Sequence, residues 1–250
     1  QDLSRELRID LFTVYREYLQ LLFLKYFYNQ KESQKIYFKG GTALRFLYDS
    51  FRFSEDLDFT SLISEDRLKR MINKSLRKLN KEAAGIRFKR VESIGESFSG
   101  KIRLELSELK FPLTIRLDFS MREKPVLGGE SSYIETNFPV GPYPFVSHLK
   151  IEELLAEKAR AILTRSRGRD IFDIWLLFSK KVPLDWKLVN NKMAFYKKKT
   201  GKAELIEAVE EFDPDEIKND LTRFLPTSHR HLVNEIKALT LKKLKENSFG

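Results

Sequence analysis

The spacing of apolar residues changes along the 250-residue chain, and each spacing predicts a different kind of element. Residues 3–29 carry apolar side chains three and four positions apart, which predicts one long helix. A short helix is expected over 42–48, and a helix rich in lysine and arginine over 64–82. Alternating or short apolar runs predict strands at 35–38, 56–60, 85–93, 100–109 and 111–120.

The remainder of the chain has a different pattern. Segment 121–147 is rich in proline and glycine, which predicts a loop region and a domain border. We therefore expect an α+β protein, with a mixed sheet and flanking helices over 1–147 and a helical bundle over 148–250. Helical spacing after the border predicts helices at 148–166, 169–180, 184–198, 202–211, 214–224 and 229–246.

The charge of the chain narrows the classes of partner that it is expected to bind. Its formal net charge is +10, with lysine and arginine spread along its whole length. Such a surface favours polyanions, for example nucleic acids or nucleotide phosphates. The alternative is a chain that is lysine-rich everywhere and has the same balance without such a partner.

The numbers of cysteines and histidines and the lengths of the apolar stretches argue against disulfide-bonded, zinc-binding and membrane-spanning proteins. The chain has no cysteine, which excludes a disulfide framework and a thiolate metal site, and its three histidines make a zinc centre unexpected. No apolar stretch is long enough to span a membrane, so no membrane partner is expected. We therefore expect a cytoplasmic protein.

A pair of glycines, Gly40 and Gly41, lies between a predicted strand and a predicted helix. Because glycine has no Cβ, phosphate groups can approach the backbone of such a turn, and the N–H groups of a helix start favour an anion. Thr42 offers a hydroxyl donor at the same place. The simpler interpretation is that the glycines only form a turn.

Two aspartates, Asp56 and Asp58, alternate with apolar residues in the predicted strand 56–60. Side chains two positions apart share one face of a strand, so these carboxylates repel each other unless a cation lies between them. Mg²⁺ prefers oxygen ligands of this kind and retains substrate phosphate in its shell. Asp118 alternates with apolar residues in the same way in the predicted strand 111–120. It would complete a two-metal site if that strand neighbours 56–60. The alternative interpretation of Asp118 is a strand residue that only faces solvent.

Two blocks of the sequence match a known pattern. "KGGTAL" (39–44) with "RFSEDLDF" (52–59), and further on "EKARAILTRSRGRDIFDIW" (157–175), resemble the AbiEii/AbiGii toxin family of nucleotidyltransferases, a branch of the DNA polymerase β-like superfamily. The resemblance extends over residues 1–180. It implies a polymerase β-like nucleotidyltransferase fold and transfer of a nucleoside monophosphate from an NTP. For some members the acceptor is the 3′ end of tRNA, and such enzymes are toxins paired with an antitoxin.

The resemblance also assigns roles by position. Lys158 would contact the phosphates of the nucleotide, and Asp173 would support that lysine or the acceptor. Asp170, closer to the start of the same predicted helix, is interpreted as a cap or a partner of the helix dipole. The implied phosphate-binding turn and metal ligands are Gly40, Gly41, Thr42, Asp56, Asp58 and, with less support from flanking residues, Asp118.

Two other polar residues near these motifs have open interpretations. Arg45, one turn into the helix after the glycines, either reaches phosphate or forms a surface salt bridge. Ser54 either donates a hydrogen bond to phosphate or shapes the turn before the aspartates.

Three functional hypotheses follow. The leading one is a Mg²⁺-dependent nucleotidyltransferase toxin that uses an NTP and an RNA acceptor, with tRNA favoured, and that has a cognate antitoxin. The second is a phosphotransferase with the same pocket, which would release a nucleoside diphosphate instead of pyrophosphate. The third is a non-catalytic nucleic-acid-binding protein on this scaffold, which the paired aspartates argue against.

Overall fold

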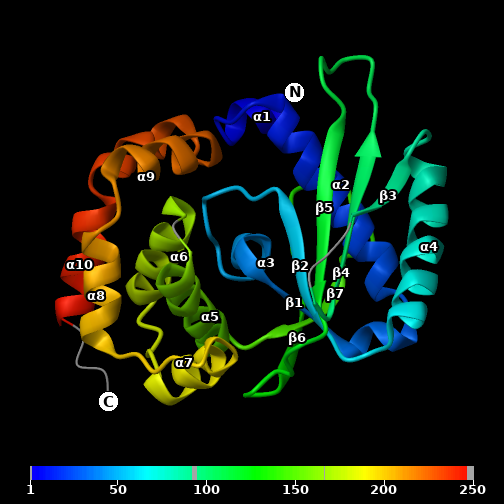
Figure 1. Ribbon diagram of the computed structural model, residues 1–250. Helices are drawn as coiled ribbons and strands as arrows, with labels where there is room; N and C mark the ends of the chain where they lie inside the picture. Colours follow the sequence, from blue (N-terminus) through cyan, green and yellow to red (C-terminus); the bar gives the residue numbers. More distant parts are fainter. Residues whose placement is uncertain (1, 92–94, 166, 247–250) are drawn as a thin grey trace. The chain divides into compact units, whose positions relative to one another are not determined.

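The structure, a computed structural model, describes residues 2–91, 95–165 and 167–246. The chain forms two compact units, Gln1–Leu149 and Lys150–Gly250, whereas the expected border followed residue 147. The first unit holds a seven-stranded sheet, and the described part of the second is helical (Figure 1). The α+β class, with a mixed sheet followed by helices, is therefore confirmed.

The first unit begins with two helices, so the prediction of one helix over 3–29 was wrong. α1 (Asp2–Glu6) ends before Arg8, which has a left-handed φ of 50°. α2 (Leu11–Tyr28) then begins at the N-cap Asp10, whose carboxylate accepts a hydrogen bond from a backbone N–H of the first turn at 2.9 Å. The cap and the left-handed residue end the first helix although the apolar spacing continues.

The sheet has the strand order β3-β4-β5-β2-β1-β7-β6 (Figure 1). β2 pairs antiparallel with β1 and parallel with β5, and β1 pairs parallel with β7. The strands are β1 (Ile36–Lys39), β2 (Asp56–Ser61), β3 (Arg87–Val91), β4 (Ser97–Leu104), β5 (Leu113–Ser120), β6 (Gly129–Tyr133) and β7 (Phe145–Leu149). The expected strand 85–93 is thus shorter, and residues 92–94 lie outside the described part.

The interpretation of 121–147 as loop was wrong in part, because this segment contains β6 and the start of β7. β7 also continues to Leu149, where a helix was expected from residue 148. These strands are short and lie among prolines and glycines, so their local pattern is weak. Their backbone groups are satisfied by pairing with each other and with β1, which lies about a hundred residues earlier in the chain.

The core of the first unit lies between one face of the sheet and two helices. α2 packs on β5 and β7 and against α4 (Glu65–Glu82). Aromatic rings from the strands and from α2 meet there, and the rings of Phe59 and Phe119 stack with centroids 4.5 Å apart. α3 (Gly40–Leu47) packs against β1 and β2 (Figure 1). The described residues also form a 3₁₀ helix, Lys31–Lys35, that precedes β1.

The second unit consists of short helices. None of the described helices in either unit has the length and hydrophobicity needed to pass through a lipid bilayer. The α-helices are α5 (Ile151–Thr164), α6 (Gly168–Ser179), α7 (Trp186–Met193), α8 (Lys202–Glu210), α9 (Pro214–Leu221) and α10 (Ile236–Glu246), and the 3₁₀ helices are Ala194–Tyr196, Thr222–Phe224 and Thr227–Asn234.

Candidate active site

β2 lies inside the sheet, and its side chains alternate between the core and the opposite face. Leu57 and Phe59 are fully buried in the core, whereas Asp56 and Asp58 are half-buried on the other face. β5 runs parallel to β2, in a register that places Asp118 directly beside Asp58. The structure therefore brings the three carboxylates that were singled out in the sequence to one face of two neighbouring strands.

The glycine turn lies against the same carboxylates. β1 pairs with β2 so that Lys39 is opposite Asp58, and α3 begins at the next residue, Gly40. Gly40 has a φ of 80°, and a Cβ on it would lie 2.2 Å from an Oδ of Asp58. Only glycine meets both conditions, because the backbone conformation and the close carboxylate each exclude a side chain.

Gly41 allows a second close approach. A Cβ on Gly41 would lie 2.4 Å from an Nη of Arg52 and 3.0 Å from the Oγ of Ser54. Arg52 is only 2% exposed and donates a hydrogen bond to the carbonyl of Phe53 at 2.9 Å. The start of α3 therefore packs against a buried guanidinium and a serine hydroxyl, both of which can attract an anion.

The hydroxyl of Thr42 and the guanidinium of Arg45 have partners within the protein. Thr42 is buried and donates to the backbone carbonyl of Asp56, which fixes the start of α3 to the start of β2. Arg45 forms an ion pair with Glu17 of α2, at 3.0 and 3.2 Å, and donates to the carbonyl of Ser50 at 3.0 Å. For Arg45 the geometry favours the salt-bridge alternative over a contact with phosphate.

Asp118 has two partners that the sequence did not indicate. The Nε of Arg116 lies 2.7 Å from one carboxylate oxygen, and Ser99 of β4 donates its hydroxyl to the other. Within the described residues, no three carboxylate, histidine or cysteine side chains are arranged as a metal site. Only the strand register identifies Ser99 as a neighbour, because β4 and β5 are joined through backbone pairs.

Lys158 in the second unit is the centre of a buried ion network. Its ammonium lies 2.8 Å from Asp170 and 2.7 Å from Asp173, and both carboxylates are almost completely buried. Arg165 also donates to Asp170, at 3.1 Å. Asp173 was expected near Lys158, but Asp170 was interpreted as a cap, although its position one turn before Asp173 places both on one helix face.

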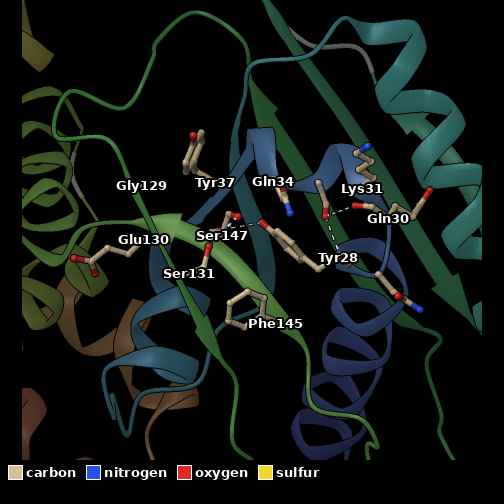
Figure 2. Close-up of a pocket in the computed structure, with 12 residues that line it drawn as sticks. Tyr28, Gln30, Lys31, Gln34, Tyr37, Gly129, Glu130, Ser131, Phe145 and Ser147 are labelled. Carbon is tan, nitrogen blue, oxygen red and sulfur yellow. Dashed lines mark hydrogen bonds between the residues drawn. The ribbon is translucent and has the colours of Figure 1, made fainter.

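The first unit also contains a cavity of about 460 Å³, which Figure 2 shows. The carboxylates of β2 and β5 are not among its lining residues. The buried hydroxyl of Tyr28 lies at its wall, 2.8 Å from the carbonyl of Ile36 and 3.0 Å from that of Ser147, and burial raises the pKa of this phenol. The cavity and the carboxylates are therefore distinct features of this unit.

Several solved structures share the fold of the chain, among them the following two. JHP933 from Helicobacter pylori has 20% sequence identity and a TM-score of 0.59, and the match covers 95% of each chain. MenT4, a nucleotidyltransferase toxin from Mycobacterium tuberculosis, has 19% identity and a TM-score of 0.57, and the match covers 95% of this chain and 85% of MenT4. At such identities the likeness shows the fold alone.

A family model identifies the chain more closely. The model described as "Nucleotidyl transferase AbiEii toxin, Type IV TA system" matches residues 22–238. The chain therefore belongs to the AbiEii family of nucleotidyltransferase toxins, which confirms the resemblance found in the two sequence blocks. Among curated proteins, the comparison gave no match.

Proposed function

We propose that this nucleotidyltransferase binds an NTP, with its phosphates on the Gly40–Gly41 turn and its metal ions on the carboxylates of β2, and transfers a nucleoside monophosphate to an RNA hydroxyl. The observation that carries the proposal is the contact between Gly40 and Asp58, which is so close that no Cβ fits between them. An anion-binding turn and a metal-binding carboxylate are then side by side, as a metal-bound triphosphate requires.

The oxygen donors of the site suit divalent metal ions by their chemistry, although the described side chains are not arranged as a three-ligand metal site. Asp56 and Asp58 present two carboxylates on one face of β2, and Asp118 adds a third from β5. These oxygen donors suit Mg²⁺, and the three residues would hold two such ions. When bound, the ions neutralise the charge of the triphosphate and lower the pKa of the attacking hydroxyl.

The side chains and backbone of the first unit would align the reaction. The N–H groups at the start of α3 orient the phosphates, and Thr42 keeps this turn fixed to β2. The acceptor oxygen forms a bond to the α-phosphorus, the bond from that phosphorus to the β-phosphate oxygen breaks, and pyrophosphate leaves. Asp118 accepts the proton of the acceptor hydroxyl, while Arg116 and Ser99 hold its carboxylate in place. Ser54, close to Gly41, donates to a phosphate oxygen.

Lys158 and Asp173 of the second unit complete the proposal. Lys158 would contact the phosphates of the nucleotide, and its two buried carboxylate partners would orient the ammonium. Arg45 remains a candidate for phosphate binding, although its guanidinium, like the ammonium of Lys158, is already paired with a carboxylate.

The RNA acceptor and the biological role are parts of the same proposal. The net charge of +10 supports a nucleic-acid acceptor, and tRNA is the acceptor that we propose. The family description refers to a toxin–antitoxin system, so we expect a cognate antitoxin. Because NTPs and tRNA are substrates of the cytoplasm, we place the reaction there.

The test is transfer of label from each α-labelled NTP to total RNA in the presence of Mg²⁺. Asp56→Asn, Asp58→Asn and Lys158→Ala should each reduce labelling by about a hundredfold or more. Asp66→Asn serves as the matched control, because Asp66 is an exposed carboxylate on α4. Equal labelling by all five proteins would overturn the site, and release of nucleoside diphosphate in place of pyrophosphate would favour the phosphotransferase hypothesis.

A further inference from the structure

An array of cations occupies the face of the sheet that carries the carboxylates. Strand alternation places five side chains on that face of β3, β4 and β5, and all five are exposed. β3, β4 and β5 are adjacent strands at one side of the sheet (Figure 1). The five residues, which we call the cation array, are Arg87, Lys89, Lys101, Arg103 and Arg116.

The array consists of like charges that are direct neighbours. The register pairs Arg87 with Arg103, and it places Lys89, Lys101 and Arg116 in one row across three strands. Like charges that face each other directly across neighbouring strands destabilise a sheet. The array therefore lowers the stability of the fold unless an anion binds to it.

Among the residues that the structure describes, acidic side chains do not neutralise the centre of the array. Arg116 is paired with Asp118 at 2.7 Å, and Arg87 lies 3.9 Å from Glu105. Across the described parts of the chain, Lys89, Lys101 and Arg103 form no ion pair. The cations of α4 differ, since Lys69 is paired with Glu65 at 2.8 Å on the same helix.

Protection of a sheet edge does not explain these residues. Lysine on an edge strand prevents pairing with other chains, and this accounts for β3, which lies at the edge of the sheet. β4 and β5 are interior strands, so Lys101, Arg103 and Arg116 have no such role. Edge protection and the ion pair with Asp118 therefore leave the charges of Lys101 and Arg103 unexplained.

The array leads to the proposed site. The row of Lys89, Lys101 and Arg116 continues across the sheet to Asp56, which is paired with Arg116 in the register. Neighbouring strands are about 4.8 Å apart, so the row spans roughly 10 Å from the edge of the sheet to β5. The ring of Phe88 packs against Gly100 on the opposite face, so this side of the sheet offers cations without an aromatic surface from β3.

We propose that the cation array binds the sugar–phosphate backbone of the acceptor RNA and directs its terminal hydroxyl toward Asp56, Asp58 and Asp118. This inference rests on the proposed function. Contacts of this kind are made to phosphates and not to base edges, so binding depends strongly on salt and weakly on sequence.

The test compares two triple variants with the same change in net charge. Lys89→Ala with Lys101→Ala and Arg103→Ala removes the unpaired cations of the array. Arg70→Ala with Lys74→Ala and Lys81→Ala, on exposed positions of α4, is the control. Binding of a short, fluorescein-labelled, single-stranded RNA is measured by anisotropy over a range of salt concentrations, without NTP.

The array variant should bind at least about tenfold more weakly at low salt, and the slope of log K against log salt should fall by about 2, since three phosphate contacts are lost. The control should retain most of the affinity and the slope. Equal weakening of both variants, or no weakening of the array variant, would overturn the inference.

A further variant separates this inference from the proposed function. Asp58→Asn should bind the RNA like the wild type while transferring nucleotide at least about a hundredfold more slowly. If the wild type labels no RNA but the array variant still loses binding, the proposed function fails and the RNA surface stands. If the wild type labels RNA and the array variant has the same KM for it, the surface is wrong and the proposed function stands.

Discussion

At the scale of the residue, the proposed site depends on a single position without a side chain. Gly40 combines a left-handed backbone with a carboxylate oxygen at 2.2 Å from where its Cβ would lie. The left-handed backbone by itself makes any non-glycine residue at this position unfavourable, at a cost in folding free energy of about 1–2 kcal/mol. This cost does not depend on the proposed site. The close contact with Asp58 is specific to the site. A substitution at another left-handed glycine therefore separates the effect of the backbone conformation from the effect of this contact.

Gly40→Ala should therefore reduce nucleotidyl transfer by about a hundredfold, because Asp58 must move by an ångström or more to make room. Gly85→Ala is the matched control, since Gly85 has a φ of 88° and no atom within 4 Å of the added Cβ. Both variants should lose stability in urea unfolding through the left-handed backbone, Gly40→Ala more than Gly85→Ala because of the contact with Asp58, and only Gly40→Ala should lose activity. Equal activity in the two variants would show that the position of Asp58 tolerates the substitution.

At the scale of the element, Tyr28 joins helix α2 to the sheet. Its hydroxyl lies within hydrogen-bond distance of the carbonyl of Ile36 in β1 and of that of Ser147 in β7. Figure 2 shows Tyr28 and Ser147 at the wall of the cavity. The phenol is buried, and its burial raises the pKa well above the ordinary value of 10.0. The folded protein consequently keeps this proton at a pH at which the unfolded chain loses it.

This linkage predicts how Tyr28→Phe changes stability with pH. Near neutral pH the variant should lose about 1 kcal/mol, because the single phenol proton, which lies between two carbonyls, no longer donates a hydrogen bond. Above pH 10 the wild type alone loses stability through Tyr28, by up to about 1.4 kcal/mol per pH unit, until the raised pKa is reached. The difference between the two unfolding free energies should therefore shrink as the pH rises above 10.

Urea unfolding at neutral pH and above pH 10 measures this difference. Tyr143→Phe, at an exposed position, controls for the removal of a phenol as such. A gap between wild type and Tyr28→Phe that stays constant or widens over this range would contradict the prediction.

At the scale of the whole molecule, the binding of Mg²⁺ and NTP should be visible as thermal stabilisation. A ligand that binds only the folded protein stabilises it by about 2.7 kcal/mol at a hundred times its Kd. For a chain of this size that corresponds to an increase in Tm of about 5–10 °C. Scanning calorimetry with and without NTP should detect the shift for the wild type.

The same experiment separates the contribution of the metal. Removal of Mg²⁺ with EDTA should abolish most of the shift, and Asp58→Asn should have a similar effect at the same NTP concentration. Asp66→Asn should respond like the wild type. A full shift in the presence of EDTA would mean that the nucleotide binds without the metal that the carboxylates are proposed to hold.

The sequence by itself determined the features that depend on local periodicity. Alternation in 56–60 and 111–120 fixed which side chains face the core and which face outward, so Asp56, Asp58 and Asp118 could be selected before the strands were placed. The glycine pair marked the turn between a strand and a helix. The helical pattern after residue 150 likewise follows from spacing within single elements. The bounds were wrong in part, since α7 ends at Met193 where a helix was expected to 198, and α10 begins at Ile236 where one was expected from 229.

Only the tertiary structure decided which of these residues are neighbours. Asp118 lies beside Asp58 because β5 pairs with β2, and β6 and β7 are strands because they pair with each other and with β1. The cation array exists for the same reason, since its charges come from three strands with separate positions in the sequence. Strand pairing joins residues that are far apart along the chain, and local patterns do not carry this information.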